Sequence, residues 1–225
     1  MSIIKEKDRH EFGKVLSGLP NPVKLLMFTQ DFECQSCVQT RSLLEEVAEL
    51  GDMISLQVSD FVRESHVARE YGVEKIPAIV VRGDEDYGIR FYGIPGGYEF
   101  STLVETIVAV SRRESGLEAE VTELLGKLKH PVHIQVMVSP TCPNCPSVAL
   151  AAHRFALASE KITSDTVEIT DFPQLALRYE IGSVPITIFN ERRRITGVLP
   201  VIELAREVLS STSSRRDIWP RDMWQ

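Results

Sequence analysis

The sequence predicts the α/β class, with two tandem units that each have a mixed central sheet and helices on both faces. Two Cys-x-x-Cys motifs, beginning at Cys34 and Cys142, lie 108 positions apart. Two prolines, Pro77 and Pro185, repeat at the same spacing. Around these landmarks, short apolar runs alternate with segments of helical periodicity. Because a random chain would rarely repeat both features at one offset, we infer a duplication.

Further matches support the duplication and place its boundary. At the same offset Tyr71 matches Tyr179, and Val73 matches Ile181. The composition changes around residues 114–116. We therefore expect an N-terminal unit over residues 1–115 and a C-terminal unit, with a short tail, over residues 116–225.

The first unit alternates helices and strands and ends in a hairpin and a helix. Its opening helix carries Phe12, Val15 and Leu16 at helical spacing and stops at Pro20. The helix after the first cysteine motif has an apolar face and stops at Gly51. The predicted order is helix 8–19, strand 23–29, helix 34–50, strand 53–58, helix 63–71, strands 77–81 and 89–92, and helix 98–110.

The second unit repeats this order. Its opening helix carries Leu117, Val121, Leu124 and Leu128 on one face. The predicted elements are helix 117–128, strand 132–138, helix 143–159, strand 163–169, helix 173–179, strands 186–189 and 195–197, and helix 201–209. Strands alternating with helices and followed by a hairpin indicate a mixed sheet.

Composition and charge exclude several functions. The chain is 43% hydrophobic with a net charge of −7, so it is neither disordered nor equipped with the basic face that broad nucleic-acid binding needs. Its longest apolar run, residues 76–81, is too short to span a bilayer, and the first ten residues are rich in charge. We expect a cytoplasmic protein that binds neither membrane nor nucleic acid.

The four cysteines, Cys34, Cys37, Cys142 and Cys145, indicate redox chemistry. A Cys-x-x-Cys pair at the start of a helix places two sulfurs one turn apart, within the range that a disulfide bond tolerates. Unpaired N–H groups at the helix N-terminus stabilise the thiolate of the first cysteine. We therefore predict that Cys34 and Cys142 are nucleophiles and that Cys37 and Cys145 resolve the mixed disulfide.

These motifs resemble the thioredoxin fold, and two such units in one chain resemble the glutaredoxin-like protein disulfide oxidoreductases, known mainly from thermophilic archaea and bacteria. The second motif, Ser139 to Cys145, is closer to a glutaredoxin site than to a thioredoxin site. The resemblance implies cis peptide bonds before Pro77 and Pro185. It also implies that the backbone of Ile76 and Val184, beside these prolines, binds an extended substrate chain.

The resemblance further implies reduction, oxidation and isomerisation of protein disulfides, without a bound cofactor or metal. Electrons would come indirectly from NADPH through a thioredoxin-reductase-like flavoprotein. This chain departs from the family pattern in two respects. Thioredoxins have a buried Asp six positions before the first cysteine, where this chain has Phe28 and Val136, so another carboxylate, such as Asp31, would have to move inward. Neither unit carries a clear glutathione-binding pattern.

The two sites are not predicted to be equal. Asp31 and Glu33 precede Cys34, and nearby anions oppose a thiolate, whereas the residues before Cys142 are neutral. Pro143 would occupy the first helical position, and Pro146 would then strain the first turn. We expect Cys142 to have the lower pKa and to be the more reactive nucleophile.

Three other functions fit parts of the pattern. A dedicated electron carrier between a flavin-dependent thioredoxin-type reductase and a peroxidase would use the same cysteines. A non-enzymatic chaperone would use only a hydrophobic groove. A Cys₄ zinc scaffold would need its pairs about 15–20 residues apart, whereas 104 residues separate Cys37 from Cys142. The tail from residue 210 onward, with Trp219 and Trp224, is predicted either to dock on a surface or to be flexible.

Overall fold

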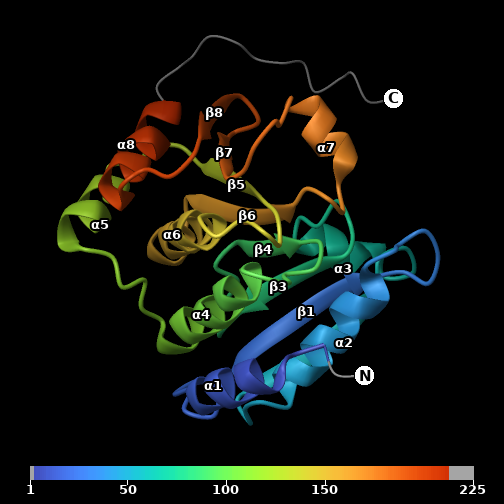
Figure 1. The fold of residues 1–225 in the computed structure, drawn as a ribbon. Coiled ribbons are helices and arrows are strands. Elements are labelled where there is room, and N and C mark those ends of the chain that lie inside the picture. Colours follow the sequence, from blue (N-terminus) through green and yellow to red (C-terminus); the bar gives the residue numbers. More distant parts are fainter. Residues whose placement is uncertain (1–2, 213–225) are drawn as a thin grey trace.

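The computed structural model describes residues 3–212, which form eight helices and eight strands (Figure 1). The first half contains α1 (Glu6–Leu16), β1 (Val23–Thr29), α2 (Cys37–Ala48), β2 (Ile54–Asp60), α3 (Ser65–Glu70), β3 (Ala78–Arg82), β4 (Ile89–Tyr92) and α4 (Glu99–Arg112). The second half contains α5 (Ala119–Gly126), β5 (Val132–Val138), α6 (Cys145–Ala158), β6 (Ile162–Glu168), α7 (Pro173–Arg178), β7 (Ile186–Phe189), β8 (Arg193–Thr196) and α8 (Val201–Ser211).

The strands form one continuous mixed sheet in the order β2-β1-β3-β4-β6-β5-β7-β8. Within each half, the first strand pairs in parallel with the second and antiparallel with the third, and the third pairs antiparallel with the fourth. The duplication predicted from the sequence therefore holds strand by strand. The two expected sheets, however, are fused into one.

The fusion joins unlike edges. β4, the last strand of the first half, pairs in parallel with β6, which corresponds to β2, in a register that opposes Ile89 to Ser164 and Tyr92 to Val167. The halves therefore follow one another head to tail, and a two-fold axis does not relate them. β2 and β8 are left as the outer edges of the sheet.

Alternation along the strands divides the core between the two faces of the sheet. Leu25 and Met27 of β1 point into a large cluster with residues of α1, α2, α4, α5, α6 and α8. Leu26 and Phe28 point the other way, into a smaller cluster beneath α3 and α7. Helices thus cover both faces, as predicted, and Figure 1 shows the sheet between them.

The sequence predicted the strands more closely than the helix ends. Four strands have the predicted bounds, including β1 and β5. The helix predicted over residues 8–19 is instead α1, which ends at Leu16, although Leu19 is still buried in the core. Apolar spacing marks which residues are buried, whereas capping hydrogen bonds decide where a helix ends.

Two further features bear on the sequence analysis, the apolar character of the helices and the C-terminal end of the chain. Within residues 3–212, no helix has the length and the apolar character needed to cross a membrane. The composition shift expected from residue 210 begins inside α8, which continues to Ser211. Trp219 and Trp224 lie outside the described residues.

Candidate active site

The first cysteine pair lies in the loop between β1 and α2. Cys34 and Cys37 are joined by a disulfide bond, with their Cα atoms 5.4 Å apart. Cys37 is the first residue of α2 and only 2% exposed, whereas Cys34 is half-buried. The sulfur that a substrate can reach is therefore that of Cys34, the predicted nucleophile.

The second pair occupies the corresponding loop between β5 and α6. Cys142 and Cys145 are also joined by a disulfide bond, and their Cα atoms are 5.5 Å apart. Cys145 is completely buried at the start of α6, and Cys142 is 8% exposed. Both sites thus share the same order, with an outer first cysteine and a buried second one.

Both helices begin later than predicted. The first helical residue is the second cysteine of each pair, and Cys142 lies in a turn in which its N–H donates to the Ser139 carbonyl (3.1 Å). Pro143 therefore precedes the helix. Pro146 falls in the first turn of α6, where a missing N–H is tolerated, so the expected strain at Pro146 was wrong.

The predicted cis peptide bonds are present at Ile76–Pro77 and Val184–Pro185. In both units a glycine of the following hairpin donates its N–H to the proline carbonyl, from Gly93 to Pro77 (3.0 Å) and from Gly197 to Pro185 (2.9 Å). The repeat therefore extends to the contacts of these loops.

The second cis-proline loop lies directly beside its cysteine. The carbonyl oxygen of Val184 is 3.7 Å from the sulfur of Cys142. Among residues 3–212, no equivalent sulfur–carbonyl contact joins Ile76 to the first pair. The structure thus brings Val184 and Pro185 to their cysteine, whereas Ile76 and Pro77 occupy the same position in the fold without a comparable contact.

The charges around the two sites differ as the sequence predicts. Asp31 and Glu33 precede the first nucleophile and are both exposed, so neither has moved into the core. Glu33 also has a left-handed backbone, with φ of 57°. The second loop, residues 139–144, carries no charged side chain. An anionic loop thus surrounds Cys34, and a neutral loop surrounds Cys142.

The first turn of α4 supplies a buried acid that the sequence analysis missed. Glu99 is only 1% exposed, and neither of its carboxylate oxygens has a hydrogen-bond partner within the described residues. Burial raises its pKa to about 7, although the nearby Thr102 hydroxyl opposes this rise. Its neighbours in a small gap include Val138 and Glu168 of the second half. A Glu on an otherwise apolar helix face was the only available signal.

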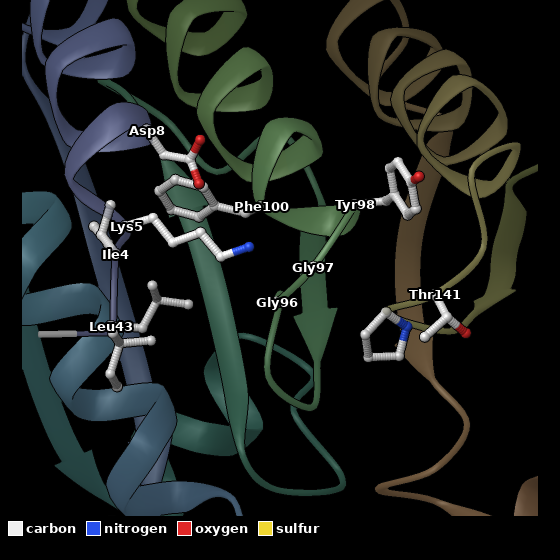
Figure 2. Close-up of a pocket in the computed structure, with 11 residues that line it drawn as sticks. Ile4, Lys5, Asp8, Leu43, Gly96, Gly97, Tyr98, Phe100 and Thr141 are labelled. Atoms are coloured by element: carbon white, nitrogen blue, oxygen red, sulfur yellow. The ribbon is translucent and has the colours of Figure 1, made fainter.

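A pocket of about 500 Å³ lies beside the second site and is shared by both halves (Figure 2). Figure 2 shows Leu43 of α2 and Phe100 of α4 on one side of the Gly96–Gly97 turn and Thr141 on the other side. Thr141 is the residue immediately before Cys142. The pocket therefore opens next to the second nucleophile but far along α2 from the first.

A second pocket, of about 420 Å³, lies between the halves and is strongly polar. His133 contacts both Asp165 and Glu191 at 2.8 Å. Burial alone would lower the pKa of His133, but these two hydrogen bonds outweigh burial and raise it to about 10. The Lys75 ammonium lies 3.6 Å from the centre of the Tyr92 ring. Within residues 3–212, no cluster of His, Cys, Asp and Glu is arranged to hold a metal ion.

Comparisons with known proteins agree with this architecture. The thioredoxin domain family matches residues 132–210. A protein disulfide oxidoreductase from Aeropyrum pernix K1 is 31% identical, with a TM-score of 0.87 over 95% of this chain and 96% of that chain. The NTD_N/C domain of alkylhydroperoxide reductase from Enterococcus faecalis is 28% identical, with a TM-score of 0.85 over 91% of this chain and 99% of that chain.

The match to curated proteins is partial. A component of the alkyl hydroperoxide reductase of Staphylococcus epidermidis is 30% identical over 180 residues, which cover 80% of this chain and 32% of that protein. The chain therefore spans about a third of the length of the curated relatives that it matches. The Aeropyrum pernix protein, by contrast, is matched over nearly its whole length. By its two cysteine pairs, its fused double sheet and this full-length match, the chain belongs to the protein disulfide oxidoreductase family.

Proposed function

We propose that the chain is a two-site protein dithiol–disulfide oxidoreductase that acts on protein substrates. The observation that carries this proposal is the second site, where an outer cysteine, a buried cysteine and the Val184 carbonyl beside a cis-proline meet. The repeated first site supplies a second cysteine pair in the same arrangement. We assign the two sites to units 1–115 and 116–225.

In the reductive direction, the Cys142 thiolate attacks one sulfur of a substrate disulfide. A mixed disulfide forms, and the other substrate sulfur leaves as a thiolate that takes a proton. Cys145 then attacks the Cys142 sulfur, which closes the enzyme disulfide and releases the second substrate thiol. Two electrons pass from the enzyme dithiol to the substrate. Cys34 and Cys37 perform the same steps at the first site.

The reverse sequence oxidises a substrate dithiol. Isomerisation follows when another thiolate of the substrate, instead of Cys145, attacks the mixed disulfide, so that a new substrate disulfide forms and the Cys142 thiolate leaves. We propose that the backbone of Val184, Pro185, Ile76 and Pro77 aligns the substrate chain beside the sulfurs. The redox groups are the cysteine pairs themselves. We propose that NADPH reduces them indirectly, through a thioredoxin-reductase-like flavoprotein. The cytoplasmic location remains a prediction.

The likeness to alkyl hydroperoxide reductases favours a second candidate, a dedicated electron carrier between a flavoprotein reductase and a peroxidase. Such a carrier would use the same thiol chemistry on one partner. The two functions differ in breadth. A general oxidoreductase acts on unrelated disulfide proteins, whereas a dedicated carrier acts only on its peroxidase.

The deciding experiment measures the reduction of several unrelated disulfide proteins by the dithiothreitol-recycled protein. Site-specific variants C34S/C37S and C142S/C145S separate the two sites, and the variant with all four cysteines changed to serine is the control. We expect each two-cysteine variant to retain activity and the four-serine variant to have none. Activity that survives in the four-serine variant would reject the proposal.

A further inference from the structure

The turn before α4 belongs to the first half but contacts the second active-site loop. The N–H of Tyr98 donates to the carbonyl oxygen of Pro140 (3.0 Å). Pro140 lies inside the turn that begins at Ser139 and ends at Cys142, closed by the Cys142 N–H. The hydrogen bond from Tyr98 therefore holds the central peptide of the turn that carries the second nucleophile.

Gly97 makes this contact possible. Its φ is +59°, and a Cβ added there would lie 2.2 Å from the Pro140 carbonyl oxygen and 2.9 Å from its carbonyl carbon. Both are backbone atoms, so no side-chain rotation could relieve such an overlap. The close approach of the two backbones thus requires glycine at position 97.

Within the described residues, the second half donates no matching backbone hydrogen bond to the first active-site loop. In the first site, residues 31–34 correspond to residues 139–142, but within the described chain no backbone hydrogen bond closes that turn. At the spacing of 104 positions that relates Gly93 to Gly197, Val201 stands where the first half has Gly97, and among the described residues no backbone hydrogen bond joins residues 200–202 to the first active-site loop. The head-to-tail fusion explains this, because the first half adjoins the second through β4, whereas β8 of the last hairpin forms the outer edge of the sheet.

We infer that the turn formed by Gly96, Gly97 and Tyr98 of the first half is a positioning element of the second active site. Its backbone fixes the Pro140 peptide and so the place of the Cys142 sulfur beside the Val184 carbonyl. The second site is therefore complete only when the first unit is attached, whereas the first site is complete by itself. This inference rests on the proposed function, because it concerns the same cysteines.

The test places Gly97→Ala in two full-length backgrounds, C34S/C37S and C142S/C145S, which retain one site each. In the first background we expect disulfide reduction to slow by about tenfold or more, since a small misplacement of a reacting atom is costly. The pH profile of Cys142 alkylation should also shift. In the second background, activity at Cys34 should change by less than about twofold.

Gly116→Ala is the matched control. Gly116 has a similar φ of +63°, yet nothing lies within 4 Å of an added Cβ, so it imposes the backbone strain without the collision. We expect no more than about a twofold change at either site. An equal loss at both sites in Gly97→Ala, or an unchanged second site, would overturn the inference.

A second pair of variants covers the case in which Gly97→Ala does not fold. Tyr98→Pro removes the donated N–H at a position whose φ of −66° suits proline, and Tyr98→Ala removes the same exposed ring but keeps the N–H. Tyr98→Pro should impair the second site more than Tyr98→Ala does, and equal effects would reject the inference. If both single-site proteins with Gly97 intact are inactive, the proposed function fails. The pH profile of Cys142 alkylation still tests the inference in that case, because it does not depend on turnover.

Discussion

At the scale of a single residue, ionisation of the Glu99 carboxyl group is unusually costly. Its pKa is about 7 in the folded chain against an ordinary value of 4.5, because burial disfavours the carboxylate. Between these two values the folded state binds the proton and the unfolded state does not. The stability that this group supports is therefore present at low pH and is lost as the pH rises through 7. A shift of this size corresponds to about 3 kcal/mol.

Glu99→Gln should remove this pH dependence. We expect the variant to be more stable than the parent at pH 8.5 by about 2–3 kcal/mol and close to it at pH 5, because the amide never ionises. Urea denaturation at the two pH values measures the difference. Glu105→Gln, on the exposed side of the same helix, should shift both values by less than about 0.5 kcal/mol. A parent that gains stability between pH 5 and 8.5 relative to Glu99→Gln would contradict this reasoning.

The two nucleophiles provide a second prediction at the residue scale. Asp31 and Glu33 place negative charge beside Cys34, and nearby anions oppose a thiolate, so we expect them to raise the pKa of its thiol. Cys142 has no such neighbours, although its deeper burial works in the opposite direction. We expect the charges to dominate and Cys142 to have the lower thiol pKa. The pH dependence of iodoacetamide alkylation in the two single-site variants measures both values, and a lower pKa at Cys34 would refute the ranking.

Among the elements, the short helices α3 and α7 depend on arginines from the hairpins. Each has only six residues, too few to be stable alone. The carbonyl of Tyr71, at the end of α3, accepts hydrogen bonds from Arg90 at 2.9 and 3.1 Å. The carbonyl of Tyr179, at the end of α7, accepts one from Arg194 at 2.8 Å. The two arginines are 104 positions apart, the spacing that also relates Gly93 to Gly197.

These two equivalent arginine–carbonyl contacts predict unequal losses of stability when each arginine is replaced. Arg90 is buried and also bonds the Asp86 carboxylate, whereas Arg194 is exposed. Arg90→Gln should destabilise the protein by about 3 kcal/mol, because a partly buried carbonyl and a partly buried carboxylate lose their partner. Arg194→Gln should cost less than about 1 kcal/mol. Chemical denaturation of both variants tests the ranking, and equal losses would show that the arginines do not act through burial.

The elements also show what sequence patterns can predict. Alternation and apolar runs located β1, β4, β5 and β7 to the residue, because burial of a strand face sets both the pattern and the structure. The helix ends were predicted less closely, because capping hydrogen bonds decide where a helix ends and do not change the spacing of its apolar residues. The active-site cysteines were found from their repeat, whereas Glu99 was missed, because a single acidic residue at the start of an amphipathic helix is usually exposed.

The seam between β4 and β6 shows the limit of sequence reasoning at the scale of the whole molecule. Both strands carry polar side chains, as solvent-exposed edge strands also do, so the sequence could not predict that the two sheets are fused. The fusion matters because it forms one large hydrophobic cluster from both halves. Across the seam, the Phe91 ring lies 4.8 Å from the ring of His153, and α4 packs against α6. Neither half therefore keeps its core when the other opens.

A shared core predicts that the two halves unfold together, although each half has its own complete set of strands and helices. Cys37 and Cys145, which are almost completely buried in the two halves, report on each half of the reduced protein. Brief alkylation at increasing urea concentrations should expose both thiols at the same midpoint, and calorimetry should give one transition with equal calorimetric and van't Hoff enthalpies. Phe91→Ala should lower both midpoints together, since it removes a ring from the seam. Separate midpoints for the two thiols would mean that each half is stable by itself and that the shared core does not couple them.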